Sequence, residues 1–372
     1  MSINNQTSKV ALPGRVVSVD FFRGITMFLL AGESTRLFGQ LLKIDSGFMQ
    51  FLGTQLEHHE WHGLHFWDLI QPFFMFIVGV AIPFAVANRK RKGATDKQIL
   101  YHVLKRSFLL LFFGWGLYFV AAGRLVFRFQ NVLAQLSVTY LVAYLIMNKS
   151  FRFQIIFTLL ILLLIDLAYR YFPVEGFNHP WTNYENLGAW FNNKIEGVDK
   201  ASEWATLNFV STTAHTVWGV LCGRLLQSDK KPIKKIQILT VAGIAALLIG
   251  FSLDWLNVTP IIKKIATSSF VFASGGLTIL VLAFCYWLID VKKLFQKGSL
   301  FFIIVGMNSI FIYMFFHLGG SGWIQEILNP FSELLFSWGG ELVVGIITSL
   351  ATWAVLWYIT FWLYKNKVFV KI

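Results

Sequence analysis

The residues best suited to chemistry in this sequence lie in one short segment, LEHHEWHGLHFWDLIQPFFMFIVG, at positions 56–79. Three histidines and two glutamates fall within residues 57–63, just before an apolar run. A neutral imidazole can accept a proton from an amine or hydroxyl nucleophile near pH 7. Glu57 or Glu60 could orient that imidazole or bind a cationic substrate. Acid–base chemistry at the mouth of a membrane helix is therefore one role that these residue types allow.

The histidine spacing leaves three interpretations open. His58, His62 and His65 stand at i, i+4 and i+7, so on a helix they would share one face and could bind zinc. The HExxH arrangement is absent and no cysteine is nearby, which argues against a metal. The histidines could instead hydrate a helix end at the membrane interface. In the third interpretation, one of them is a general base.

Asp68 is the most costly charge in the sequence. A charge at mid-membrane costs about 2.5–3.5 kcal/mol, so such residues mark function or pairing. Asp68 lies one turn into its predicted span, and no cation stands at helical spacing within that span. We expect its partner to be Arg23, Arg124 or a histidine. In the first span, Asp20 with Arg23 and Glu33 with Arg36 are i,i+3 pairs, typical of structural ion pairs.

The composition indicates that membrane helices position these residues. The 372 residues are 56% hydrophobic and only 14% charged, whereas a soluble domain carries about 25% charge. Apolar runs of helix-spanning length recur, without the alternating segments of a membrane barrel. We predict an all-α polytopic integral membrane protein with ten transmembrane helices in one bundle. The predicted spans are 20–42, 66–88, 103–123, 131–147, 153–172, 206–227, 238–256, 267–289, 300–317 and 341–364.

The net charge of +13 is better explained by membrane topology than by nucleic-acid binding. With the N-terminus cytoplasmic, 21 of the 32 Lys and Arg residues fall inside and eight outside. This bias predicts both termini in the cytoplasm and the histidine cluster outside it. The polar stretch 1–15 shows no cleavable signal sequence. We expect a multi-pass protein of the inner (cytoplasmic) membrane.

The organisation of the chain indicates a single domain over residues 1–372. No Pro, Gly or Ser linker and no fixed-period repeat interrupts it. Residues 173–205 form the longest expected loop, on the outer side, where Trp, Tyr and Asn could contact a sugar or lie at the bilayer interface. The stretch 319–341 is expected to be an outer loop or a re-entrant segment. Cys222 and Cys285 both lie in apolar runs, so neither a disulfide framework nor a cysteine metal site is expected.

Five ordered segments resemble the membrane-bound heparan-α-glucosaminide N-acetyltransferase family and its bacterial relatives. RVVSVDFFRGI (15–25) resembles the family's S-V-D-x-F-R-G opening, and HHEWHGLHFWDLIQPFFMFIVGV (58–80) its H-x-x-W-x-G-x-x-x-x-D-L-x-x-P block. NVLAQLSVTYLVA (131–143), PIIKKIATSSFVFASGG (260–276) and DVKKLFQKGSLFFIIVGMNSIFIYM (290–314) are similar to later family segments. The chain departs from the family around Glu33–Ser34, where an asparagine is replaced, and at Gln135, where the family has arginine.

The resemblance implies transfer of acetyl from cytosolic acetyl-CoA to a glucosamine-like amine on the far side of the membrane. Alignment on Trp61 places the family's catalytic histidine at His58. The expected acceptor is an amino sugar or short oligosaccharide, and the expected surroundings are lipid, with no nucleic acid and no metal. A homodimer is compatible with the sequence. The runner-up function is a transporter of amino sugars or cell-wall sugar fragments, and a third is a non-catalytic membrane partner.

The expected site residues fall into three groups. The catalytic group is His58, Asp68 and Asn308, with His58 as general base and Asn308 as an oxyanion donor. The substrate-binding group is Glu57, Glu60, Trp61, His62 and Ser309. Cations for the phosphates of acetyl-CoA are expected at Arg124, Arg128 and Lys263, and in the basic loops 89–106 and 230–235.

Overall fold

The computed structural model describes residues 16–370 and 372, and these are helical apart from turns and loops. The described residues contain no strand, only an isolated bridge between His62 and Ile262. The all-α prediction is therefore confirmed for this part of the chain. The polar N-terminal stretch, with Lys9 and Arg15, and Lys371 at the other end lie outside the described residues.

The chain forms two compact units made of alternating segments. The larger unit contains residues 16–19, 59–64 and 71–287. The smaller unit contains residues 20–58, 65–70 and 288–372. The histidine segment therefore contributes to both units, because His58 and His65 belong to the smaller unit and residues 59–64 to the larger one.

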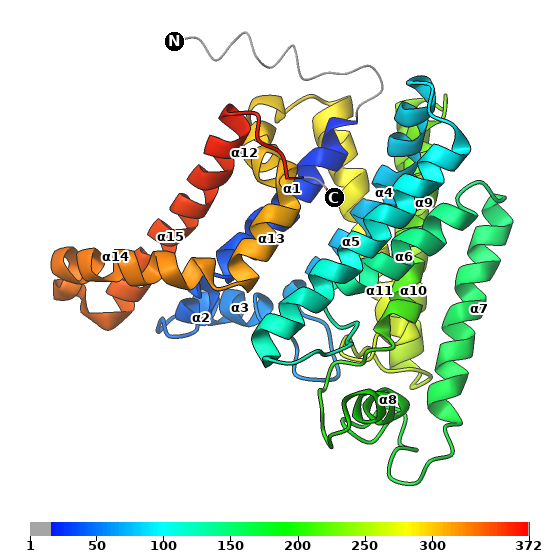
Figure 1. Cartoon of the computed structure of the whole chain (residues 1–372), viewed down its shortest axis with the longest axis horizontal. Helices are drawn as coiled ribbons and strands as arrows, with labels where there is room; N and C mark the ends of the chain where they lie inside the picture. The colour runs from blue at the N-terminus through cyan, green and yellow to red at the C-terminus, as the bar shows by residue number, and fades with distance from the viewer. Residues whose placement is uncertain (1–15, 371) are drawn as a thin grey trace. The chain divides into compact units, whose positions relative to one another are not determined.

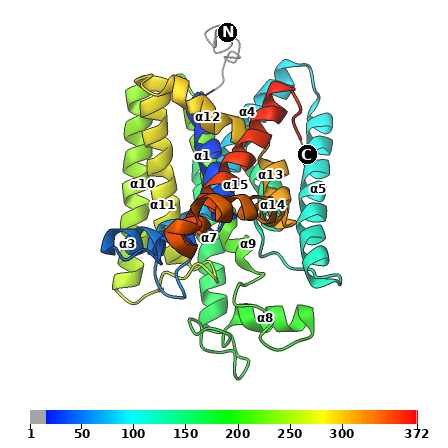
Figure 2. The same ribbon diagram turned by 90° about the vertical axis from the view of Figure 1, so that its left-hand side faces the viewer.

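The larger unit is a bundle of long helices that run side by side, with a short helix, α8, lying crosswise to them near the lower end of α7 (Figures 1 and 2). Side chains of Thr95, Asn131, Ser150 and Thr267 cap helix N-termini by accepting a backbone N–H. The helices are α4 (Ile70–Arg91), α5 (Asp96–Ala122), α6 (Val132–Ile146), α7 (Phe151–Arg170), α8 (Leu187–Glu196), α9 (Asn208–Gln227), α10 (Pro232–Trp255) and α11 (Ser268–Cys285).

Glycines let α4 and α9 approach closely in the larger unit. A Cβ on Gly79 would lie 2.0 Å from the Thr216 carbonyl oxygen, and one on Gly219 would lie 2.2 Å from that of Phe76. Close backbone contact between small residues is a common way for membrane helices to pack. Around this contact, α9 buries polar side chains in the middle of the unit.

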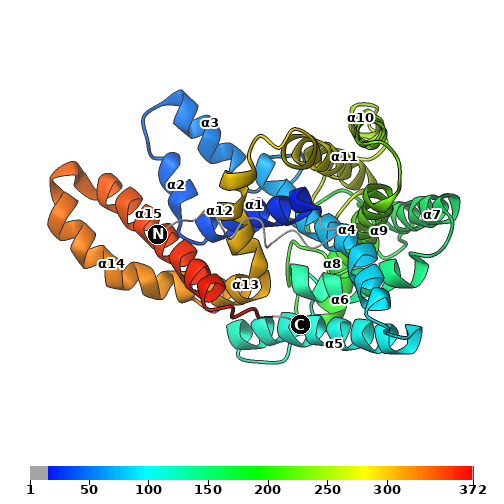
Figure 3. The same cartoon turned by 90° about the horizontal axis from the view of Figure 1, so that it is seen from above.

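In the smaller unit, α1 packs against α12 and α15. A Cβ on Gly24 would lie 2.3 Å from the Phe302 carbonyl oxygen, and Phe28 stacks on Trp353 with ring centroids 4.3 Å apart. Seen from above, α14 and α15 lie side by side (Figure 3). The helices of this unit are α1 (Val17–Glu33), α2 (Leu37–Leu41), α3 (Gly47–Gln55), α12 (Gln296–Met307), α13 (Ser309–His317), α14 (Gly320–Phe336) and α15 (Gly340–Lys365).

Six helical segments of the described chain are long and apolar enough to cross a membrane, or seven if α12 and α13, bent by 59°, form one span. Each of the ten predicted spans overlaps a helix, but the count of ten is not confirmed. The helix α1 has 17 residues and α6 has 15, and α9 carries a run of polar side chains. The chain nevertheless has the helices of a multi-pass membrane protein.

Two predicted elements differ from the structure. The expected helix 20–42 ends at Glu33, and Arg36 has a left-handed backbone with φ 61° before the short α2. Glu33 and Arg36 therefore do not share a helix as an i,i+3 pair. The segment 319–341, expected to be an outer loop or a re-entrant segment, contains the helix α14, so it is not a loop, while the re-entrant alternative stays a prediction. The pair of Asp20 and Arg23 is present, at 2.6 Å.

Candidate active site

A histidine and a buried aspartate meet in the smaller unit. Asp68 belongs to a 3₁₀ turn, Phe66–Leu69, that leads into α4, and it is fully buried. Its Oδ1 lies 3.0 Å from Nδ1 of His58, whose side chain is 41% exposed. A histidine is thus a partner of the costly carboxylate, as one of the three sequence-based alternatives proposed.

Local backbone contacts fix the position of the Asp68 carboxylate. Its second oxygen, Oδ2, accepts the backbone N–H of His65 at 2.8 Å, which is half of a capping box for the turn. The His65 ring Nδ1 lies 3.1 Å from the Glu57 carbonyl oxygen. Next to Asp68, Trp67 is buried and packs edge-on against Phe38, with centroids 5.1 Å apart. Both carboxylate oxygens are therefore held by defined partners.

This geometry suits proton transfer at the exposed side of the His58 ring. An ionised Asp68 keeps the proton on Nδ1, so the lone pair is on Nε2. The buried carboxylate also stabilises the imidazolium that forms when Nε2 takes a proton. An aspartate and histidine arranged in this way can orient a general base and then return its proton to a leaving group.

Residues 59–64 of the cluster belong to the larger unit. His62 Nε2 lies 2.7 Å from Asp254 Oδ1, and the Gly63 N–H donates to the Ile261 carbonyl at 2.9 Å. The Trp61 indole N–H donates to the Trp181 carbonyl at 2.7 Å. Trp61 thus joins the residue 59–64 segment to the loop 173–205.

The helical face that the zinc interpretation required is not present in the structure. Residues 57–65 form turns and extended backbone, so His58, His62 and His65 do not lie on one helix. His58 and His62 instead contact different carboxylates. Within the described ranges, no group of three or more His, Cys, Asp or Glu side chains could hold a metal ion. Glu57 and Glu60 are both exposed.

Asn308 lies at the break between α12 and α13 and is fully buried. Its Oδ1 accepts the Val370 N–H at 3.0 Å, and its Nδ2 donates to the Val368 carbonyl at 3.2 Å. Ser309 Oγ donates to the Gly306 carbonyl at 2.6 Å. The side chains of both residues therefore hydrogen-bond to backbone in this structure. To stabilise an oxyanion, Asn308 would use the second hydrogen of its amide, and Ser309 would exchange its present partner for the oxyanion.

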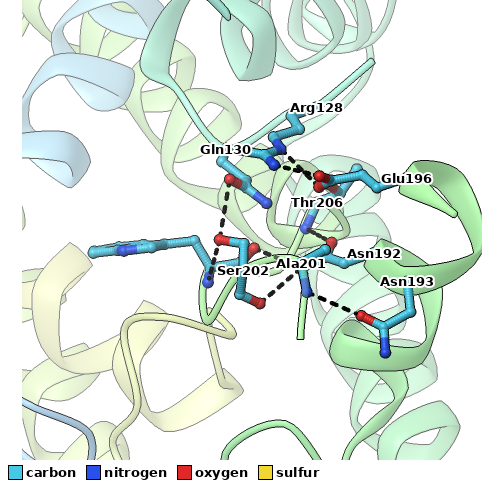
Figure 4. Close-up of polar contacts among 9 residues, drawn as sticks. Arg128, Gln130, Asn192, Asn193, Glu196, Ala201, Ser202 and Thr206 are labelled. Atoms are coloured by element: carbon cyan, nitrogen blue, oxygen red, sulfur yellow. Dashed lines mark hydrogen bonds and ion pairs between the residues drawn. The ribbon is translucent and has the colours of Figure 1, made fainter. Parts of the chain in front are cut away.

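The three expected phosphate cations occupy different surroundings in the larger unit. Arg128 forms a two-pronged ion pair with Glu196, whose side chain is 2% exposed (Figure 4). That contact raises the pKa of Arg128, with burial opposing it. Lys263 is buried, with Nζ 5.4 Å from the Trp204 ring centroid, and Arg124 is exposed. The charge of Arg128 is thus already balanced by a protein carboxylate.

The loop 173–205 is ordered and folded onto the bundle. Asn192 Nδ2 donates to the Ser202 and Trp204 carbonyls at 3.1 and 2.9 Å (Figure 4). Trp181 and Trp190 pack on an apolar cluster that includes Tyr169 and Ile262. These tryptophans therefore contribute to the apolar core of the loop, and both a sugar contact and a place at the bilayer interface stay predictions.

Asp254 is the polar residue at this end of the molecule that sequence reasoning missed. Its Oδ1 lies 2.7 Å from His62 Nε2 and also accepts a hydrogen bond from the Ile261 N–H at 2.8 Å. A signal was present, because Asp254 is a carboxylate at the end of a long apolar run, like Asp68. The pairing could not be read from spacing, since 192 positions separate it from His62.

A family model described as a domain of unknown function (DUF5009) matches residues 15–171. Over 97% of its length the chain is 24% identical to heparan-alpha-glucosaminide N-acetyltransferase of Homo sapiens. The enzyme of the same name from Mus musculus is also 24% identical, over 96% of this chain. In both cases the match covers 60% of the relative's own length. The similarity predicted from the five sequence segments is confirmed: this chain resembles the heparan-alpha-glucosaminide N-acetyltransferases along nearly its whole length.

Proposed function

We propose that this protein is a transmembrane acetyltransferase that moves acetyl from acetyl-CoA to the amine of a glucosamine-like sugar. The observation that carries the proposal is the pairing of His58 Nδ1 with the buried Asp68, 3.0 Å apart. This pairing explains why a carboxylate stands at the start of an apolar helix, and it orients the His58 ring as a base. The similarity to relatives named as N-acetyltransferases supports the reaction type.

In the proposed reaction, the acceptor amine attacks the carbonyl carbon of the thioester. His58 Nε2 takes the proton that the amine loses, while Asp68 stabilises the resulting imidazolium. The carbon–sulfur bond breaks, and the thiolate takes the proton back from His58. The products are an N-acetyl amide and free coenzyme A. Asn308 and Ser309 remain candidates for stabilising the oxyanion.

The proposed topology follows the distribution of basic residues. Both termini would lie in the cytoplasm, and the His58 site would open on the opposite side of the cytoplasmic membrane. The donor's nucleotide would face the cytoplasmic basic loops, where Lys and Arg favour phosphates. Glu57, Glu60, Trp61 and His62 would contact the acceptor, with the exposed carboxylates suited to an ammonium group.

The proposal is tested with the purified chain in lipid nanodiscs and acetyl-CoA labelled in the acetyl group. We expect labelled N-acetylglucosamine only when both acetyl-CoA and glucosamine are present. Saturating acetyl-CoA should also stabilise the fold by about 2.7 kcal/mol at 100 times its dissociation constant. His179→Gln is the matched control, since His179 lies in the outer loop beside Glu185. Glucosamine uptake into vesicles without transfer would instead support a transporter.

A further inference from the structure

A polar pocket in the smaller unit lies apart from His58 and Asp68. Its volume is about 480 Å³, within the range of about 300–1,000 Å³ typical of small-molecule sites. Arg36 and Gln40, one turn apart at α2, line one wall. Phe38, on the opposite face of α2, packs on Trp67 beside Asp68. The rest of the lining comes from α14 and α15: Gly322, Gln325, Glu326, Asn329, Pro330, Gly345, Thr348 and Ser349.

Some of these lining groups are held in place by hydrogen bonds to neighbouring residues outside the lining. Gln325 Nε2 and Ser349 Oγ both donate to the Thr35 carbonyl, at 2.5 and 2.7 Å. Asn329 Nδ2 donates to Glu333 Oε1 at 2.6 Å. These contacts tie α2, α14 and α15 together. The pocket is therefore held by its own hydrogen bonds and does not depend on a ligand for its shape.

Three polar side chains of the pocket remain available to a ligand. Within the described part of the chain, no hydrogen bond or ion pair involves the side chains of Arg36, Gln40 or Glu326. Arg36 also has the left-handed φ of 61°, a strained backbone for a residue other than glycine. The pocket thus contains one cation and one anion that are not paired with each other, a pattern complementary to a zwitterion.

The exposed face of α14 indicates what kind of molecule carries the zwitterionic group. Its apolar side chains recur every three or four residues on one exposed face, so they form an apolar stripe: Trp323, Ile327, Phe331 and Leu334. By helical periodicity, Glu326 and Pro330 stand at the border between this stripe and the pocket-lining face. A ligand in the pocket can therefore place a polar group beside Glu326 and an apolar chain along the stripe.

We propose that this pocket binds the headgroup of a phospholipid that carries a primary ammonium, as in phosphatidylethanolamine. The phosphate contacts Arg36, the ammonium donates hydrogen bonds to Glu326, and the acyl chains lie along the apolar stripe. A neutral saccharide fits less well, because the lining contains no aromatic ring for a sugar to stack on and two unpaired charges. This inference does not depend on the proposed acetyl transfer.

The experiment measures lipid retained by the purified chain in nanodiscs, by native mass spectrometry. Nanodiscs of phosphatidylcholine are doped with phosphatidylethanolamine or with phosphatidylglycerol, which lacks an ammonium. We expect phosphatidylethanolamine to be retained selectively, because the quaternary ammonium of phosphatidylcholine has no N–H to donate. Arg36→Gln and Glu326→Gln should each weaken retention roughly tenfold or more, the loss expected for a charge-assisted hydrogen bond. Equal retention of all three lipids would overturn the proposal.

Matched variants separate the pocket from general charge effects. Lys43→Gln removes an exposed cation just after α2, and Glu341→Gln an exposed anion at the start of α15, both outside the pocket lining. Both should retain phosphatidylethanolamine as the parent does. Gly322→Leu should block binding while the protein stays folded, because a Cβ at Gly322 meets no atom within 4 Å. Unchanged retention in Gly322→Leu would also overturn the proposal.

Water-soluble competitors identify the source of the headgroup. Free glycerophosphoethanolamine at millimolar concentration should displace the lipid only weakly, since it lacks the chains that lie on α14. If it binds as tightly as the lipid, the site recognises a soluble zwitterion and the membrane part of the proposal is wrong. Displacement by glucosamine at similar concentration would contradict the proposal and favour a sugar site.

Discussion

At the scale of single side chains, His58 is the group whose removal tests the proposed chemistry most directly. We expect His58→Ala to lower the rate of acetyl transfer by about 10²–10⁴-fold, the usual contribution of a positioned base. His59→Ala and His65→Ala should lose far less, although His65 also contacts the Glu57 carbonyl. The measurement is the turnover of the single variants at matched folded protein. A His58→Ala enzyme with near-normal turnover would contradict the assignment.

Asp68 provides a second test, because its effect acts through His58. Asp68→Asn keeps the shape of the side chain, but an amide can donate to Nδ1 and so favour the tautomer with its proton on Nε2. We expect a large loss in kcat with little change in KM. Asp254→Asn makes the same change at the His62 contact, 2.7 Å long, and serves as the matched control. Equal losses of kcat in the two variants would mean that the His58–Asp68 and His62–Asp254 pairs have the same role, either both acting on substrate or both structural.

Glu203 gives a prediction for pH dependence. Its pKa is lowered from 4.5, mainly by its hydrogen bond with Lys264, so its ionised form stabilises the folded loop. That stabilisation is complete above the unfolded pKa near 4.5 and is lost as the pH falls through the lower folded value. The pair is partly exposed, so the effect should be about 1 kcal/mol or less. Thermal unfolding of Glu203→Gln at pH 6 and pH 3 should show a smaller pH dependence than the parent.

At the scale of elements, the contact between α4 and α9 depends on glycine. Gly219→Ala would place a Cβ 2.2 Å from the Phe76 carbonyl oxygen, so the helices must separate. We expect a loss of about 1–3 kcal/mol, as for other overpacked interiors. Gly116→Ala in α5 is the control, since its Cβ meets no atom within 4 Å, and it should stabilise by about 0.5–1 kcal/mol. Thermal unfolding in one detergent compares the two, and equal effects would show that close packing there is unimportant.

The sequence predicted the helices better than it predicted what lies between them. Apolar runs located nearly every long helix, because burial in lipid demands a run of about 20 residues. The same signal failed for α14, where apolar residues on one face alternate with Gln325 and Asn329 on another. The apolar pattern also predicted that the first helix continues past Arg36, because no residue in that pattern indicates a left-handed backbone there.

The site was predicted in part for a similar reason. Local sequence marked Asp68 as a charge that needs a partner, and a histidine was among the three candidates. The contact itself spans ten positions of non-helical chain, so no periodic rule gives it. The shared helical face that the zinc interpretation required for His58, His62 and His65 does not form, because Gly63, with φ 148°, and its neighbours form turns and extended chain. Pairing at long range, as for His62 with Asp254, depends on tertiary structure alone.

At the scale of the whole molecule, the charge distribution predicts which side of the membrane each loop faces. Cysteines introduced singly at Glu57 and Lys92, both exposed, distinguish the alternatives. We expect a membrane-impermeant thiol reagent applied outside the cell to label position 57 and not position 92. Cys222 and Cys285 are buried, so they should give little background. The reverse labelling pattern would place the His58 site in the cytoplasm and contradict the proposed topology.

The alternation of the two units along the sequence has a consequence for how the protein is made. His58 and Asp68 leave the ribosome early, but Trp353, whose ring packs against Phe38, is among the last residues synthesised. Helix α1 likewise waits for α12, whose Phe302 carbonyl closes over Gly24. At about 5–20 residues per second, the interval is on the order of 10–60 s. During that time the packing face of α1 is uncovered, so a chain interrupted before α12 would present that face to the cell's quality control.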